Sequence, residues 1–364
     1  MINYKNKIKN ITILIITIII SISIMISILI MPNIINVFAN STAEIVMEVN
    51  TNRVVHALNE KNIKYMASTT KILTAITVIE NCDINEIVEI KKKTTGIEGS
   101  SIYLEEGEKL SVKDLLYGLM LRSGNDCAET LAVHVSGYIK DFACLMNNTA
   151  RKIGANDSNF VNPHGLHDDN HYTTAYDLAL ISCYAMKNNI FREIVGTKSI
   201  KIPFTTRNSV RLLINKNKLL NGLDGCTGIK TGYTKKAGRC LVSSALKNGI
   251  EFVSVVLNCP DMFEISKNLL TNTLSNYKNY KIVNSDNIIY FIDGKNGEKY
   301  GTYIKNDIVL PLTTDEYENI NIKVNLNKNL SFPIKKDQEV GNVEIYCKNN
   351  LIFSEKIYTI LEIK

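Results

Sequence analysis

The sequence predicts an α+β protein, with an antiparallel sheet flanked by helices and followed by a small all-β domain. Two hairpin patterns predict the sheet: polarity alternates around Asn50-Thr51-Asn52, and Asn248-Gly249 joins two apolar-rich runs. Between them, apolar residues recur at helical spacing. After about Tyr280 this helical periodicity is lost, and short strand patterns broken by turns remain.

The first 39 residues predict an export segment. An uncharged run from Ile11 to Ile30 follows three lysines and precedes Val37-Phe38-Ala39. A basic start, an apolar middle and small residues at the end are typical of a secretory signal peptide, although a run of this length also spans a bilayer. We expect cleavage after Ala39, with a retained membrane anchor as the alternative. Either way, the protein is expected to work outside the cytoplasmic membrane.

Length and charge narrow the function class. The formal net charge is +6, and three of these charges belong to the export segment. The rest of the chain is too mildly basic to predict a nucleic-acid partner. Its length predicts two domains, at residues 40–278 and 279–364. The eight cysteines lack metal-ligand spacing, so we expect buried free thiols, with one or more disulfides as the alternative.

The stretch Ala67-Ser68-Thr69-Thr70-Lys71 leads into an apolar helical run at residues 72–79. Residues three apart share one face of a helix, so the side chains of Ser68 and Lys71 can meet. A serine hydroxyl becomes a good nucleophile when a neighbouring base takes its proton, and a neutral lysine can be that base. The helix N-terminus also favours an oxyanion at Ser68.

Taken alone, Ser-x-x-Lys is a weak signal, since an N-cap serine followed by a surface lysine gives the same pattern. The spacing recurs at Ser244 and Lys247, and at Ser275 and Lys278. The Asn-Gly hairpin places Ser244 on a strand and Lys247 in a turn. The other pair ends a helix expected over residues 261–278, with nothing apolar after it to bury a catalytic pair.

A second polar signal is Ser123-Gly124-Asn125. A helix that starts at Ser111 should end there, and another should begin at Asp126, so these residues lie on a tight interhelix loop that can point into a cleft. A plain turn is the alternative. A further amphipathic helix is expected over residues 173–187.

A third signal is Lys230-Thr231-Gly232, followed by Tyr233, on a predicted strand. The lysine supplies positive charge and the threonine a hydroxyl for a substrate carboxylate. The glycine has no side chain, so an extended substrate can lie against the strand. The alternative is an ordinary polar edge strand.

Residues 162–171 contain three of the five histidines and two aspartates. Pro163 and Gly165 make this stretch a loop and not a helix on which a His-x-x-His pair would converge. We therefore predict no metal site, and a metallopeptidase built on His164, His167 and His171 stays as an alternative.

In the β-rich tail the sequence predicts a spacer or platform without chemistry of its own. Strands are expected at residues 288–292, 303–310, 320–324, 343–346 and 351–360. Two further short strands are ambiguous, at residues 85–91 and 101–104.

The three polar signals, in this order, resemble the motifs of the penicillin-recognising serine enzymes. The match is closer to one branch, the D-alanyl-D-alanine carboxypeptidases or low-molecular-mass penicillin-binding proteins. It covers roughly residues 43–277, is carried by residues 67–80, 121–128, 162–166 with 171–178, and 230–238, and extends more weakly to 332–341 in the tail. Such enzymes commonly end in an amphipathic helix on the membrane, whereas residues 357–364 resemble a strand. This difference adds weight to an N-terminal anchor.

The resemblance implies a β-lactamase/transpeptidase-like fold and a reaction without a cofactor. Ser68 would attack the bond between two terminal D-alanines of a peptidoglycan stem pentapeptide, with Lys71 as base and Ser123 as proton relay. The substrate amide would be held by Asn125, and the substrate carboxylate by Lys230 and Thr231. The oxyanion hole would consist of the backbone N–H groups of Ser68 and Tyr233, and Gly232 would let the substrate lie against the strand. β-Lactams would acylate Ser68 as inhibitors.

Two other functions remain open at this point. A serine β-lactamase needs a deacylating carboxylate, and the loop with Asp168 and Asp169 shows no convincing Glu-x-x-Leu-Asn pattern. A non-catalytic penicillin-binding sensor module would become acylated without releasing product.

Overall fold

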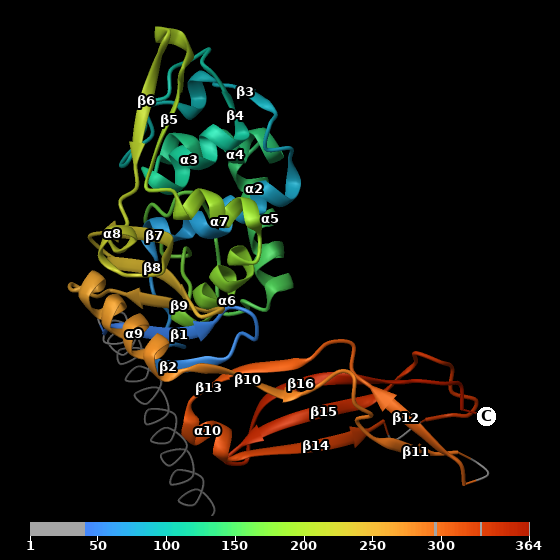
Figure 1. Cartoon of the computed structure of the whole chain (residues 1–364). Coiled ribbons are helices and arrows are strands. Elements are labelled where there is room, and N and C mark those ends of the chain that lie inside the picture. The colour runs from blue at the N-terminus through green and yellow to red at the C-terminus, as the bar shows by residue number, and fades with distance from the viewer. Residues whose placement is uncertain (1–40, 295–296, 328–329, 364) are drawn as a thin grey trace, which may run out of the picture.

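The structure is a computed structural model that describes residues 41–294, 297–327 and 330–363. The predicted export segment therefore lies outside the described residues. A large N-terminal domain of helices and strands joins an elongated β-rich domain at one end (Figure 1). Within the described ranges, no helix has both the length and the apolar character that crossing a membrane requires.

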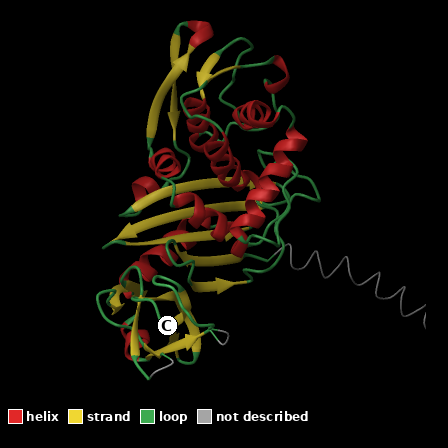
Figure 2. Cartoon of the chain, turned by 90° about the vertical axis from the view of Figure 1, so that its right-hand side faces the viewer, coloured by secondary structure: helices red, strands yellow, loops and turns green. Residues whose placement is uncertain are grey.

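The core of the N-terminal domain is a five-stranded antiparallel sheet in the order β2-β1-β9-β8-β7. It confirms both predicted hairpins. Figure 2 shows these strands side by side, with helices of the N-terminal domain on one side. Along the buried strand β9, Val253 and Val255 join the main helical core, while Phe252 and Val256 pack with residues of α9. The strands are β1 (Ala43–Glu48), β2 (Val54–Leu58), β7 (Cys226–Thr234), β8 (Gly238–Lys247) and β9 (Ile250–Leu257).

The central helix is α2, which contacts α3 to α7 (Figure 1). The predicted start of α3 is confirmed, because Ser111 caps it and Asp114 completes a capping box. The helices are α2 (Lys71–Asn81), α3 (Val112–Leu121), α4 (Asn125–Ser136), α5 (Ile139–Ile153), α6 (Ala175–Met186), α7 (Asn189–Gly196), α8 (Leu219–Gly222) and α9 (Met262–Asn276).

Of the two ambiguous short strands, one is present and one is wrong. β3 (Ile87–Glu89) forms, but it pairs with β4 (Lys109–Ser111). The segment at 101–104 is not a strand, because the carboxylate of Asp126 accepts its backbone N–H groups at Ile102 and Leu104 in place of a ladder partner. The hairpin of β5 (Ser199–Phe204) and β6 (Ser209–Ile214) was not predicted.

The C-terminal domain is built on a sheet in the order β11-β12-β16-β15-β14, with β10 and β13 paired beside it. The strand expected at 303–310 is wrong as one unit: β12 ends at Tyr303 and β13 begins at Ile308, because Asp307 turns toward Ser285. The elements are β10 (Lys278–Val283), β11 (Phe291–Asp293), β12 (Lys299–Tyr303), β13 (Ile308–Leu312), α10 (Thr314–Glu318), β14 (Ile320–Leu326), β15 (Glu339–Cys347) and β16 (Asn350–Thr359).

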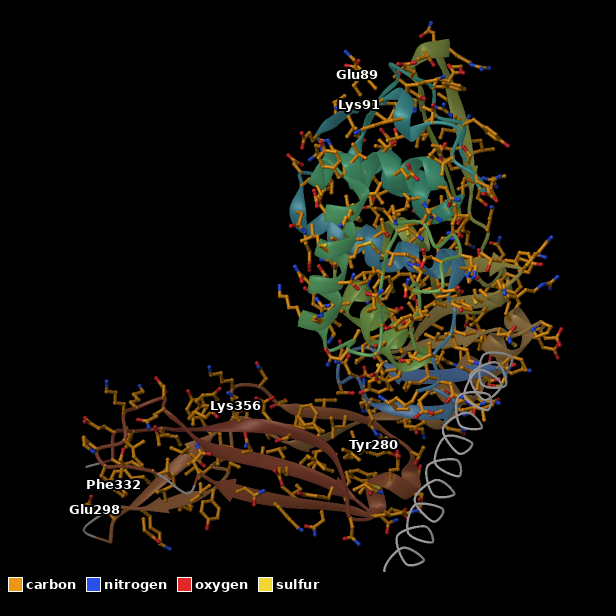
Figure 3. The ribbon with its side chains drawn as sticks, turned by 180° about the vertical axis from the view of Figure 1, so that it is seen from behind. Glu89, Lys91, Tyr280, Glu298, Phe332 and Lys356 are labelled. Carbon is orange, nitrogen blue, oxygen red and sulfur yellow. The ribbon has the colours of Figure 1, made fainter. Side chains whose placement is uncertain are left out.

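The two domains meet beside the turn between β1 and β2. Arg53 donates to the carbonyl of Pro311 over 2.9 Å and forms an ion pair with Glu316. Figure 3 places Tyr280 near this joint and Phe332 at the far end of the C-terminal domain. All eight cysteines are free thiols, of which Cys144 is exposed.

Candidate active site

Ser68 lies on a 3-10 turn, Ala67–Thr70, that runs directly into α2. The other three residues of the turn are buried, whereas Ser68 is partly accessible. Ala67 has a φ of 48°, which is in the left-handed region that side-chain-bearing residues rarely adopt. The turn therefore presents the Ser68 hydroxyl at the start of a helix, as predicted.

Lys71 is fully buried, and its Nζ has three neighbouring acceptors. They are Ser68 Oγ at 3.2 Å, Asn125 Oδ1 at 2.7 Å and the carbonyl of His164 at 2.6 Å. The two carbonyl oxygens can only accept hydrogen bonds. A neutral amine has two hydrogens, so when these satisfy the carbonyls its lone pair faces Ser68.

The charge state of Lys71 fits this arrangement. Its pKa is lowered well below the usual value, first by burial and then by the neighbouring charge of Lys230, with Lys216 adding to the effect. Cys127 and Asp126 oppose this shift. The protonated form of this buried amine is therefore less favoured than that of an exposed lysine.

Ser123 lies between α3 and α4, at a φ of 65°, and is only 4% exposed. Its Oγ is one of two buried side-chain polar atoms without a hydrogen-bond partner in the described part of the chain. Leaving a buried hydroxyl unpaired costs about 1–3 kcal/mol. Such an atom at the entrance of α4 is suited to an incoming polar group.

Asn125, two residues further on, is hydrogen-bonded through both its side chain and its backbone. Its Nδ2 donates to the carbonyl of Glu98 over 2.5 Å, and its backbone N–H donates to Ser100 over 2.7 Å. Sequence reasoning missed the next residue, Asp126, which is completely buried and accepts a 2.5 Å hydrogen bond from Ser101 Oγ. Asp126 thereby holds the segment 101–104 against the loop.

The strand β7 brings the third predicted stretch against the nucleophile. A Cβ on Gly232 would lie 3.1 Å from the backbone nitrogen of Ser68, so glycine lets this strand approach closely. Lys230 is 1% exposed, and burial, with a smaller effect of Lys216, lowers its pKa to about 7. Thr231 is half-buried and Tyr233 is exposed.

The histidine-rich segment, residues 162–171, contributes a backbone carbonyl to the site. Among the described residues, no group of three or more His, Cys, Asp or Glu side chains is placed to hold a metal ion. His164 Nε2 lies 3.4 Å from Glu129, His167 Nε2 lies 3.4 Å from Asp169, and His171 Nε2 bonds to Thr70. The segment instead reaches the site through the backbone carbonyl of His164, which no side-chain pattern could have predicted.

The two repeated Ser-x-x-Lys spacings lie in ordinary structural positions. Ser244 is buried in β8 and its hydroxyl bonds to Thr227 Oγ1 at 2.6 Å. Ser275 is exposed at the end of α9 and donates to the carbonyl of Asn272 over 2.8 Å. The structure thus brings Ser68 and Lys71 together at the site and leaves these serines outside it.

Comparison with known proteins gives two family matches. Residues 35–261 match the model described as D-alanyl-D-alanine carboxypeptidase, and residues 277–364 match the C-terminal domain of penicillin-binding protein 5.

Similar sequences and structures cover most of the chain. The D-alanyl-D-alanine carboxypeptidase DacF of Bacillus subtilis is 29% identical over 82% of this chain and 79% of its own length. DacA of Haemophilus influenzae is 30% identical over the same shares. The crystal structure of penicillin-binding protein 5 from Haemophilus influenzae has a TM-score of 0.75 and 25% identity, and covers 89% of this chain and 98% of that one.

The crystal structure of the D-alanyl-D-alanine carboxypeptidase DacD from Francisella tularensis gives the same result. Its TM-score is 0.70, at 27% identity over 88% of this chain and 93% of that one. The family resemblance and the α+β fold class with its β-rich C-terminal domain are therefore confirmed. By its motifs, its fold and these matches, the chain belongs to the serine-type D-alanyl-D-alanine carboxypeptidases, the low-molecular-mass penicillin-binding proteins.

Proposed function

We propose that this carboxypeptidase removes the terminal D-alanine from peptidoglycan stem pentapeptides through an acyl-enzyme on Ser68. The observation that carries the assignment is the position of Lys71 Nζ, which lies 3.2 Å from Ser68 Oγ and within 2.7 Å of two carbonyl oxygens that can only accept hydrogen bonds. Ser68 Oγ bonds to the carbonyl carbon between the two D-alanines, and its proton passes to Lys71 Nζ.

The developing oxyanion lies against the backbone N–H groups of Ser68 and Tyr233. Each donor of this kind contributes about 2.7–4 kcal/mol to the transition state. The C–N bond then breaks, and the leaving amine takes the proton from Lys71 through Ser123, whose hydroxyl is buried and unpartnered. Water attacks the ester and releases the shortened peptide, so that Ser68 recovers its proton.

The remaining site residues bind the substrate. Lys230 and Thr231 bind the terminal carboxylate, and Gly232 lets their strand lie against the turn that carries Ser68. Asn125 is proposed to hold the substrate amide, and its Oδ1 also orients Lys71. β-Lactams acylate the same serine as inhibitors, because their carbonyl occupies the position of the scissile one.

The experiment that tests this function follows D-alanine and penicillin together. The full-length chain should release D-alanine from a pentapeptide ending in two D-alanines and carry fluorescent penicillin on Ser68. Labelling without D-alanine release would overturn the enzyme and leave a penicillin-binding sensor. Rapid turnover of a chromogenic cephalosporin would instead identify a β-lactamase, and loss of activity in excess chelator would point to a metallopeptidase.

An exported location, at the outer face of the cytoplasmic membrane or in the cell wall, belongs to the same proposal. It is supported by the apolar run from Ile11 to Ile30 behind three lysines. The mass of the mature chain, recovered from membrane and medium fractions, distinguishes cleavage after Ala39 from a retained anchor. A mature chain found only in the cytoplasm would contradict the proposal.

A further inference from the structure

The peptide bond between Ala67 and Ser68 has a special place in the proposed reaction. Its N–H belongs to Ser68 and is one of the two proposed oxyanion donors. A peptide unit is planar, so the direction of this N–H is fixed by whatever holds the Ala67 carbonyl at the other end. Because the φ of Ala67 is 48°, the turn is strained and persists through support from its surroundings.

Two groups enclose the Ala67 carbonyl. Thr70 Oγ1 donates a hydrogen bond to it over 2.8 Å, and Thr70 is completely buried. On another side the backbone of Gly165 packs so closely that a Cβ there would lie 1.9 Å from the Ala67 oxygen. The carbonyl therefore has little room to rotate.

The hydrogen bond with His171 fixes the direction of the Thr70 hydroxyl hydrogen. The backbone N–H of Val161 donates to His171 Nδ1 over 3.1 Å, so Nε2 carries the imidazole proton. Nε2 lies 2.8 Å from Thr70 Oγ1 and donates to it. With its oxygen occupied in this way, the threonine hydroxyl directs its own hydrogen to Ala67.

The surroundings of His171 fix the orientation of its ring and keep the ring neutral. The ring is 3% exposed and stands edge-on against Phe160, with ring centroids 5.7 Å apart. Burial, and then the neighbouring His164, lower its pKa to about 3, so the imidazole is neutral at physiological pH.

We infer that His171, acting through Thr70, is a positioning residue that orients the oxyanion-hole N–H of Ser68. The chain of contacts is Val161 N–H to His171, His171 to Thr70, and Thr70 to the Ala67 carbonyl. This inference rests on the proposed function, in which that N–H stabilises the oxyanion.

The test uses matched pairs of substitutions in the full-length chain. Thr70→Val removes the hydroxyl and keeps the shape, whereas Thr70→Ser keeps the hydroxyl. His171→Leu removes the donor, whereas His171→Gln keeps an N–H at a similar reach. Steady-state D-alanine release gives kcat and KM, and stopped-flow kinetics gives the benzylpenicillin acylation rate constant. Isotope-edited infrared spectroscopy gives the stretching frequency of the acyl-enzyme carbonyl.

We expect Thr70→Val and His171→Leu to lower kcat and the acylation rate constant about 10- to 100-fold, less than the roughly 10²–10³-fold that deletion of an oxyanion donor costs. KM should change less than about threefold. The acyl carbonyl frequency should rise, because a loosened hole polarises the carbonyl less. Thr70→Ser and His171→Gln should restore most of the rate, and the double variant Thr70→Val/His171→Leu should be no slower than Thr70→Val.

The inference is overturned if His171→Leu and His171→Gln behave alike, if the losses appear only in KM or melting temperature with an unchanged carbonyl frequency, or if the two losses add. Should His171→Leu fail to fold, Thr70→Val against Thr70→Ser carries the same test. Failure of the proposed function would look different: the unaltered chain would release no D-alanine.

Discussion

Lys71 Nζ lies 3.2 Å from Ser68 Oγ, and its two shorter hydrogen bonds, to Asn125 and His164, end on carbonyl oxygens. The longest of the three contacts is the one that the proposed mechanism uses for proton transfer. It is also the only one whose partner can give up a proton. In the proposed mechanism, these two carbonyls, from distant parts of the chain, orient the Lys71 amine toward the Ser68 hydroxyl.

Different losses are expected from Ser68→Ala and Lys71→Ala. Ser68→Ala should abolish penicillin labelling and D-alanine release, since no acyl bond can form. Lys71→Ala keeps the nucleophile without its base, and should slow acylation by about 10²–10⁴-fold. Intact-mass spectrometry with peptide mapping after benzylpenicillin treatment measures the acylation of each variant. Ser244→Ala and Ser275→Ala are the controls and should leave both activities essentially unchanged; an adduct on any residue but Ser68 would refute the assignment.

The pH dependence of acylation should respond to Lys230. If Lys71 is the base, acylation should rise with pH as Lys71 loses its proton, and the positive charge of Lys230 lowers the pKa of Lys71. Burial lowers the pKa of Lys230 itself to about 7, so this charge acts mainly below that pH. Lys230→Met removes it, and the rising limb of the benzylpenicillin acylation profile should shift to higher pH. Lys278→Met, at an exposed position on β10, should leave the limb in place. A shift to lower pH in Lys230→Met would contradict this coupling.

Replacement of Asp126 by Asn should weaken the wall of the site. The Asp126 carboxylate accepts from Ser101 Oγ and from the backbone N–H groups of Ile102 and Leu104. An amide has one acceptor oxygen in place of two, and each lost hydrogen bond to a charged group costs about 1.5–3 kcal/mol. We expect a lower melting temperature and faster hydrogen exchange confined to residues 98–104. Unchanged exchange there would show that the carboxylate does not hold this segment.

Stability should fall in acid because of His171. Its folded-state pKa of about 3 lies below the usual value of 6.5, so between these pH values the imidazole is protonated in the unfolded chain and neutral in the folded one. Its contribution to stability is therefore complete above pH 6.5 and is lost toward pH 3, with a slope of about 1.4 kcal/mol per pH unit. Urea unfolding at several pH values should show a shallower acid slope for His171→Gln. Equal slopes would mean that another group controls the acid limb.

The joint between the domains should depend on Arg53. Its side chain is 13% exposed and bonds both Pro311 and Glu316. Arg53→Ala should broaden the range of interdomain distances seen by small-angle scattering, while D-alanine release from a soluble pentapeptide stays within about twofold. Arg239→Ala, whose guanidinium is on the exposed side of β8, is the matched control. A large loss of peptide hydrolysis in Arg53→Ala would show that the contact between the domains also affects the geometry of the active site.

The parts of the site that the sequence predicted are those carried by local spacing. Ser68 and Lys71 are three residues apart on one helical face, and Ser123 and Asn125 share a loop between two recognisable helices. The contribution of His164 was not predictable, because a backbone carbonyl has no residue signature and lies 93 positions from Lys71 along the chain. The role of Gly165 likewise depends on a close approach between distant backbones.

The fold shows the same division. Hairpins closed by short turns, such as the one at Asn248, were predicted, whereas the hairpin of β5 and β6 was not. In its strand β6, Arg211 is buried and forms an ion pair with Glu108. Strands are predicted from apolar residues at the buried positions, and a buried arginine does not fit that pattern. In the tail, strand limits were missed where a turn interrupts the pattern, as between β12 and β13, where Asp307 accepts hydrogen bonds from Ser285.

The nucleophile's turn packs on β7, and Arg53 joins the C-terminal domain beside β2, so the site and the joint occupy opposite edges of one sheet. Because neighbouring strands lie about 4.8 Å apart, the two edges of this five-stranded sheet are roughly 20 Å apart. Over that distance, a tilt of a few degrees at the joint displaces the site by about an ångström. The direction in which the C-terminal domain points and the speed of the chemical step can therefore change independently, through residues that do not touch one another.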